Sequence, residues 1–134
     1  MVSNGHPLSA IARAMLKPLC RGLLDLVAPP TCPGCDLSSP DPASFCAACQ
    51  PLLERTEGGH SALGGYVFGG PLGDAIRRFK YGPRSDLAPA LVKLLVEALT
   101  PILGTFDALT FVPLHQRRLV ARGFDQAGLL AHGA

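Results

Sequence analysis

Apolar residues recur at helical spacing in the stretch that follows residue 65. Leu72, Ile76 and Phe79 fall on one face of a predicted helix, which the Tyr-Gly-Pro run at 81–83 ends. The charged residues between them lie on flanking or exposed faces: Asp74, Arg77 and Lys80. The pattern therefore predicts an amphipathic helix with one buried face.

A second helix is predicted directly after the first. Ser85 is expected to cap it and Asp86 lies in its first turn, while Pro89 is tolerated because a proline early in a helix loses no backbone hydrogen bond. Its apolar stripe consists of Leu87, Leu91, Leu94, Leu95 and Ala98. We interpret this stripe as core packing and not as a binding site.

Two shorter apolar runs predict strands. The run ALTFV over 108–112 is typical of a buried strand, and Tyr66 to Phe68 predict a short strand between glycine pairs. Closer to the N-terminus, a helix is predicted from about Pro18 to Val27, where two prolines stop it. The mixture of helices and strands predicts an α/β fold.

Four of the five cysteines form two Cys-x-x-Cys pairs between residues 31 and 50. Each pair, Cys32 with Cys35 and Cys46 with Cys49, sits on a tight turn that can aim two thiolates at one point. Four sulfur ligands in a tetrahedron suit Zn²⁺, with Zn–S bonds of about 2.3 Å. A shell of four cysteines leaves no open coordination position, so the pattern predicts a structural zinc site.

Two other interpretations of these cysteines are a pair of disulfides and a thioredoxin-like redox motif. Disulfide scaffolds belong to secreted chains, and residues 1–8 show no basic region leading into an apolar core. A redox motif would be a single Cys-x-x-Cys that opens a helix after a strand. We therefore favour zinc. The fifth cysteine, Cys20, lies in an apolar helical run and is expected to be a small buried hydrophobe.

The 134-residue chain is 48% hydrophobic and 16% charged, so it can bury a core. We expect a small metal module and part of a second domain, divided into an N-terminus (1–15), a helix with the zinc-ribbon module (16–57), a linker (58–65) and the second domain (66–134).

No apolar stretch approaches ~18 residues, which predicts no membrane span. With no signal peptide recognised, we expect a cytoplasmic protein.

Positive charge is concentrated in two segments although the net charge is only +2. The first contains Arg77, Arg78, Lys80 and Arg84, and the second contains Arg117, Arg118 and Arg122. The second segment follows the strand predicted over 108–112 and precedes a glycine turn and a new helix. Open α/β sheets build ligand sites at such strand ends, where arginines and helix N-termini bind phosphate. Residues 113–127 therefore predict an anion site, whereas His115 alone lacks the partner that a catalyst needs.

These motifs follow one another in a recognisable order: a helix ending in APPTC, the paired Cys-x-x-Cys motifs, YVFGGPLGDAIRRFKYGPRSDLAPALVKLL, and FDALTFVPLHQRRLVARGFDQAGLLA. Over roughly residues 19–131 the chain resembles the ComF family of competence-associated proteins. In that family a zinc ribbon precedes a type I phosphoribosyltransferase domain. The resemblance therefore implies an α/β chain in which a Cys₄ zinc ribbon is followed by the front part of a Rossmann-like phosphoribosyltransferase fold.

The resemblance also implies a ligand site. The loop from Val112 to His115 would meet the pyrophosphate side of phosphoribosyl pyrophosphate, the substrate of a full-length form. The residues implied to line or brace this site are Lys80, Tyr81, His115, Arg117, Arg118, Arg122 and Gln126. The implied role is in competence and DNA uptake, with single-stranded DNA or proteins of the competence machinery as partners.

Two features depart from the family pattern. Asp125 stands where the family usually has asparagine. In addition, the chain has no two adjacent acidic residues, whereas type I phosphoribosyltransferases bind the ribose 5-phosphate with a strand that ends in an acidic pair. We therefore expect a catalytically incomplete chain. Either it is a truncated gene product, or it uses only the front half of the family fold.

Two alternatives to this function stay open. One is a zinc-ribbon module that binds nucleic acid without enzymatic activity, with phosphate contacts from Arg77, Arg78, Lys80, Arg84, Arg117 and Arg118. The other is a remnant that does not fold.

Overall fold

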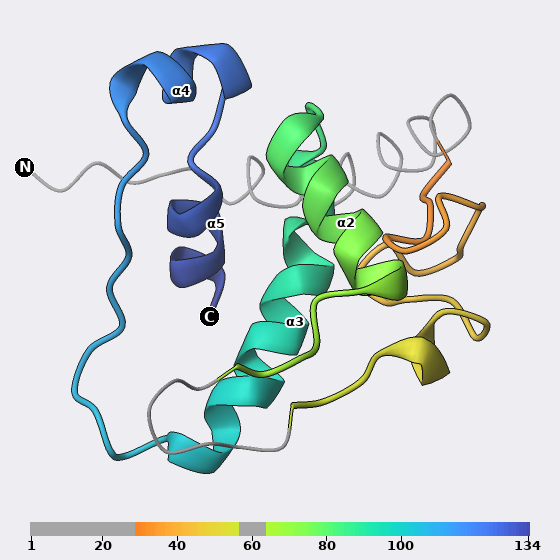
Figure 1. Ribbon diagram of the computed structural model, residues 1–134, viewed down its shortest axis with the longest axis horizontal. Helices are drawn as coiled ribbons and strands as arrows, with labels where there is room; N and C mark the ends of the chain where they lie inside the picture. The colour runs from red at the N-terminus through yellow and green to blue at the C-terminus, as the bar shows by residue number, and fades with distance from the viewer. Residues whose placement is uncertain (1–28, 57–63) are drawn as a thin grey trace, which may run out of the picture. The chain divides into compact units, whose positions relative to one another are not determined.

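A computed structural model describes residues 29–56 and 64–134 of the chain (Figure 1). The N-terminus, the helix predicted over 18–27, Cys20 and most of the predicted linker lie outside the described residues. Thr31–Ala134 form one compact unit. In the part of the chain that is described, no helix has both the length and the apolar character needed to cross a membrane.

This unit is mostly helical. Its helices and 3₁₀ turns are η1 (Gln50–Leu52), α2 (Gly70–Tyr81), η2 (Ser85–Leu87), α3 (Ala88–Leu99), η3 (Thr100–Ile102), α4 (Gln116–Arg122) and α5 (Gln126–Gly133). Within residues 29–56 and 64–134, strand pairing is limited to two isolated antiparallel bridges, Thr31 with Ser38 and Arg55 with Tyr66.

The two predicted amphipathic helices are present as α2 and α3. Helix α2 ends at Tyr81 as expected, and it buries Leu72 and Phe79. The start of the second helix differs from the prediction, because Ser85 opens the 3₁₀ turn η2 and its side chain caps neither η2 nor α3. The residue before the turn, Arg84, instead binds Asp86 with its guanidinium group.

One hydrophobic core joins the cysteine segment to the helices. Cys32, Phe45 and Cys49 are buried in the same cluster as residues of α2, η2 and α3, namely Leu72, Ala75, Phe79, Leu87, Leu91 and Leu94. Helix α5 lies beside α3 (Figure 1). The division into a metal module and a separately folding domain stays a prediction, but the two segments share one core in the folded chain.

The two predicted strands are not formed. Tyr66 makes a single bridge, and residues 108–115 run between η3 and α4 with no helix or strand (Figure 1). Leu109 and Val112 are 43% and 85% exposed, so this run is not a buried strand. A strand needs a neighbour for its backbone hydrogen bonds, and the described residues provide none for 108–112.

Candidate functional site

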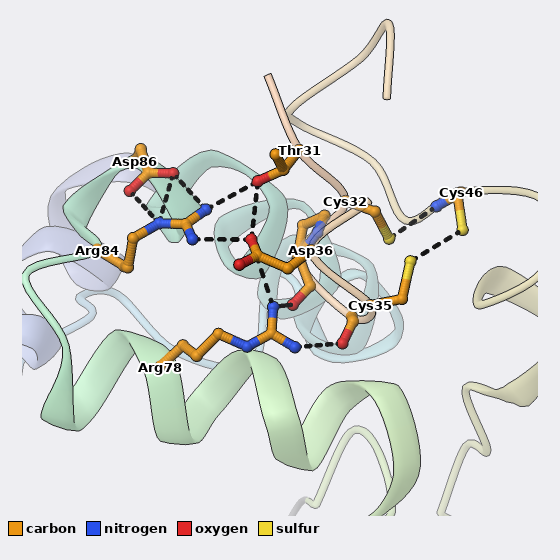
Figure 2. Close-up of polar contacts among 10 residues, drawn as sticks. Thr31, Cys32, Cys35, Asp36, Cys46, Arg78, Arg84 and Asp86 are labelled. Atoms are coloured by element: carbon orange, nitrogen blue, oxygen red, sulfur yellow. Dashed lines mark hydrogen bonds and ion pairs between the residues drawn. The ribbon is translucent and has the colours of Figure 1, made fainter. Parts of the chain in front are cut away.

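The four predicted metal ligands come together in the structure. The sulfur atoms of Cys32, Cys35, Cys46 and Cys49 all lie within 4.8 Å of one another. The sulfurs of Cys35 and Cys46 are 3.8 Å apart (Figure 2), far longer than the ~2.05 Å of a disulfide bond. Metal–sulfur bonds of ~2.3 Å in a tetrahedron separate the sulfurs by about 3.8 Å. The four cysteines are therefore free thiols that can hold one metal ion.

Two tight turns direct the four sulfur atoms toward one point. In the first, the Asp36 N–H donates to the Cys32 carbonyl, and the Cys32 N–H donates to the carbonyl of Leu37. In the second, the Cys49 N–H donates to the Cys46 carbonyl. The Cys46 N–H then donates to the Cys32 sulfur at 3.3 Å, which joins the two turns. Each Cys-x-x-Cys pair thus lies on a tight turn, as the sequence predicted.

The thiols differ in their tendency to ionise. Burial opposes ionisation of Cys32, but hydrogen bonds from the backbone N–H groups of Cys46, Cys35 and Gly34 outweigh it and lower the pKa to about 6. Burial raises the pKa of the Cys49 thiol above its ordinary value, and the neighbouring thiols raise it further. A metal ion binds the thiolate form, so it must displace the proton of Cys49, and metal binding weakens as pH falls.

Arginines from outside the cysteine segment bind the first turn (Figure 2). Arg78 of α2 donates to the carbonyl of Pro33 at 2.9 Å and also to the carbonyl of Gly34. Its guanidinium lies 3.7 Å from the Asp36 carboxylate. The sequence analysis considered Arg78 only as part of a basic segment and as a phosphate contact, since the carbonyl groups of a turn leave no signal in a sequence pattern.

Arg84 binds the same turn from the segment between α2 and α3. It donates to Asp36 at 2.8 Å and to the Thr31 hydroxyl at 3.0 Å, and it holds Asp86 with a second edge of the guanidinium (Figure 2). The hydrogen bond from Arg84 is the main cause that holds the pKa of Asp36 below its usual value, and the hydrogen bond from Thr31 is the second. Asp36 has a left-handed backbone with φ of 61°, which aspartate tolerates better than most residues.

The other residues of the first basic segment point elsewhere. Arg77 pairs with Asp74 at 3.0 Å and lies over the Phe68 ring. Lys80 has no side-chain hydrogen bond or ion pair among the described residues, and it lines a cavity of about 490 Å³ between α2, α3, the α4–α5 junction and the segments around residues 65 and 113. Most of the cavity wall is apolar, with side chains that include Leu72, Phe79, Leu91, Leu94 and Leu95.

Three of the residues implied by the family resemblance meet at this cavity. Lys80, Arg122 and Gln126 all line it. Arg122 donates to the Gln126 side-chain oxygen at 3.1 Å, and its guanidinium lies 5.4 Å from the centroid of the Tyr81 ring. The structure thus brings the end of α2 together with the α4–α5 junction, which the sequence pattern alone could not place.

His115, Arg117 and Arg118 do not line the cavity. His115 caps α4, because its Nδ1 accepts a hydrogen bond from the Arg117 N–H at 3.3 Å. Arg117 and Arg118 are exposed, and among the described residues their side chains form no hydrogen bond or ion pair.

Asp125 is a structural residue that sequence reasoning undervalued. One of its oxygens accepts from the Gly128 N–H at 3.1 Å and so caps α5, while the other accepts from the Leu114 N–H at 2.9 Å. These hydrogen bonds, led by the one from Leu114, lower the pKa of Asp125. An asparagine has only one acceptor oxygen, so aspartate can hold both segments of this junction at once. The sequence signal for this cap is an acidic residue directly before a predicted helix.

Comparison with known proteins gives two matches. The chain is 30% identical over 104 residues to "DNA utilization protein YhgH" of Salmonella typhimurium and, to the same extent, to the protein of that name from Salmonella typhi. The matched region is 74% of this chain but only 44% of each relative, so the chain spans less than half the length of these relatives. No protein-family model and no solved structure matches the chain.

Proposed function

We propose that this chain is a ComF-type protein that acts in the use or uptake of DNA. The observation that carries the proposal is the four-cysteine cluster in a chain that is similar to proteins named for DNA utilization. We propose Zn²⁺ as the ion, because four thiolates in a closed tetrahedral shell suit it best and leave no position for catalysis. The ion would stabilise the segment that contains the two cysteine turns.

The proposed ligand site lies where α2 meets the α4–α5 junction. Lys80 and Arg122 supply positive charge, and the arginine fork is suited to phosphate oxygens. Gln126 is 7% exposed, and its amide nitrogen has no hydrogen-bond partner among the described residues. A phosphate oxygen would satisfy this donor. Tyr81 braces Arg122, and His115, Arg117 and Arg118 are proposed to extend the positive charge toward a longer ligand such as phosphoribosyl pyrophosphate.

The fold and the catalytic status are part of the same proposal. We propose that residues 66–134 form the front part of a Rossmann-like phosphoribosyltransferase fold, in which 108–112 become a strand when a neighbouring strand pairs with them. Transfer requires the ribose 5-phosphate to be fixed while pyrophosphate departs, and the sequence contains no acidic pair for that task. Residues 1–134 alone are therefore expected to bind phosphate-rich ligands without transferring the ribosyl group, in a cytoplasmic setting.

Calorimetric titration with pyrophosphate and phosphoribosyl pyrophosphate tests this proposal. Arg122→Ala should weaken binding by ~1.5–3 kcal/mol, the value of a charge-assisted hydrogen bond. Arg55→Ala is the matched control, because Arg55 pairs with Glu97 and does not line the cavity. The rival function, a nucleic-acid module, predicts salt-dependent binding of random oligonucleotides with equal losses on mutating Lys80, Arg117 and Arg118. That result, with no pyrophosphate binding, would replace the proposal.

A further inference from the structure

We infer that Arg78 and Arg84 are positioning residues of the metal centre, and that through them the bound ion fixes the end of α2 that carries Lys80 and Tyr81. The inference rests on the proposed metal but not on the proposed phosphate ligand. It gives the first basic segment a task that neither the sequence motifs nor the relatives assign to it.

Arg78 binds the peptide groups that lie between two metal ligands. Its guanidinium donates to the carbonyls of Pro33 and Gly34. These two carbonyls belong to the peptide units that join Pro33 to Gly34 and Gly34 to Cys35, in the turn between the ligands Cys32 and Cys35. Hydrogen bonds at both carbonyls fix the orientation of these peptide units, and a turn held in this way keeps the two thiols in place for one metal ion. Arg78 therefore positions Cys32 and Cys35 through the backbone of their turn.

Arg84 fixes the same turn from its other side. Its contacts with Asp36 and Thr31 hold the residue that follows Cys35 and the residue that precedes Cys32. Both arginine side chains are largely withdrawn from solvent, with 28% and 26% exposure for Arg78 and Arg84. Their partner Asp36 is 48% exposed, so solvent partly screens these ion pairs. Four thiolates outweigh the charge of one divalent ion, so a loaded site is anionic and the two cations stabilise it.

Packing joins the turn to α2 at a second point. A Cβ atom at Gly34 would lie 2.7 Å from the Cβ of Pro71, in the first turn of α2, and 3.0 Å from the Cys49 sulfur. The first cysteine turn thus contacts α2 at its beginning through Pro71 and near its end through Arg78. A turn that loosens when the ion leaves would release both contacts, and with them the position of Lys80.

The test uses the whole chain and compares neighbouring arginines on one helix. Zinc affinity is measured by competition with a chromophoric chelator for wild type, Arg78→Ala and Arg77→Ala. We expect Arg78→Ala to weaken zinc binding about 10- to 100-fold, as outer-shell substitutions do, and Arg77→Ala to leave it unchanged. Equal affinities in the two alanine variants would overturn the inference. If Arg78→Ala does not fold, Arg78→Lys, which keeps the charge but loses the fork, must still weaken binding; wild-type affinity in that variant would overturn it too.

A second measurement separates this inference from the proposed function. Amide hydrogen exchange is followed for residues 78–87 and for α5, with zinc bound and after chelation. The inference predicts faster exchange at 78–87 after chelation, with a smaller change in α5, and unaltered exchange at 78–87 would contradict it. A chain that binds no pyrophosphate but shows these effects would refute the ligand site alone. A chain that binds no zinc would refute the metal centre and this inference together.

Discussion

The two basic segments of this chain look alike in sequence and differ in the structure. In the first, Arg78 and Arg84 turn toward the cysteine segment and bind its carbonyl and carboxylate oxygens. In the second, Arg117 and Arg118 face solvent. Clustered arginines therefore do not by themselves indicate a phosphate site, because the carbonyl and carboxylate oxygens of a tight turn also accept hydrogen bonds from arginine.

Helical geometry explains how neighbours in the first segment take different roles. Arg78 lies three residues after Ala75, which is fully buried, so the two share a face of α2. Arg77 lies three residues after the exposed Asp74 and pairs with it. Adjacent arginines thus point about 100° apart, one at the metal-binding turn and one at solvent.

The largest expected effect comes from a metal ligand that is also part of the core. Cys49→Ser should abolish metal binding and unfold the cysteine segment together with α2, because Cys49 is 6% exposed and belongs to the same buried cluster as Leu72 and Phe79. Structural zinc contributes ~10–16 kcal/mol of apparent binding free energy in small domains. Metal analysis and thermal unfolding by circular dichroism measure the change. Cys20→Ala should retain the metal, and retention by Cys49→Ser would contradict the account.

The next effect tests the packing of the first turn against α2. Gly34→Ala should destabilise the chain by ~1–3 kcal/mol, the usual cost of overpacking, because the new methyl group meets Pro71 and the Cys49 sulfur. Gly69→Ala is the matched control, since nothing lies within 4 Å of its Cβ position and its φ of −179° is open to any residue. Denaturant unfolding measures both variants. Equal stabilities would show that the turn is not packed on α2.

A smaller effect is expected at the junction near the second basic segment. Asp125→Asn should lower the melting temperature by less than Asp125→Ala does, because asparagine keeps one of the two acceptor oxygens. The pKa of Asp125 is depressed in the folded chain, so its contribution is complete above the ordinary pKa of 3.8 and is lost as pH falls through the lowered value. Melting curves across acidic pH check the sign, and a wild type and Asp125→Asn with the same pH dependence would speak against it.

The smallest effect should come from the solvent-facing arginines. Arg117→Ala and Arg118→Ala are expected to change the free energy of unfolding by less than about 0.5 kcal/mol, as surface substitutions usually do. Arg78→Ala should cost clearly more in the same denaturant titration. Similar losses at Arg78 and Arg118 would remove the distinction between the two segments.

The features that the sequence predicted well depend on local spacing. The Cys-x-x-Cys pairs and the apolar positions Leu72 and Phe79 fix turns and a helix face within a few residues, and these features are present. Arg78 binds the carbonyl of Pro33, which lies 45 residues away in sequence, and no periodicity of the sequence encodes such a contact. The strand predicted over 108–112 failed for a related reason, because its apolar pattern says nothing about whether a neighbouring strand is there to pair with it.

Titration of the metal-free, reduced chain with Co²⁺ tests the central claim most directly, since cobalt reports both the ligand type and the geometry by its absorption. We expect saturation at one equivalent, with strong visible bands of tetrahedral cobalt, a near-ultraviolet band from thiolate ligands, and displacement of both by zinc. Arg78→Ala should reach the same spectrum only at higher cobalt concentration, and Arg77→Ala should follow wild type. Absence of the thiolate band, or a spectrum of octahedral cobalt, would contradict a four-cysteine metal centre and the role of the arginines that surround it.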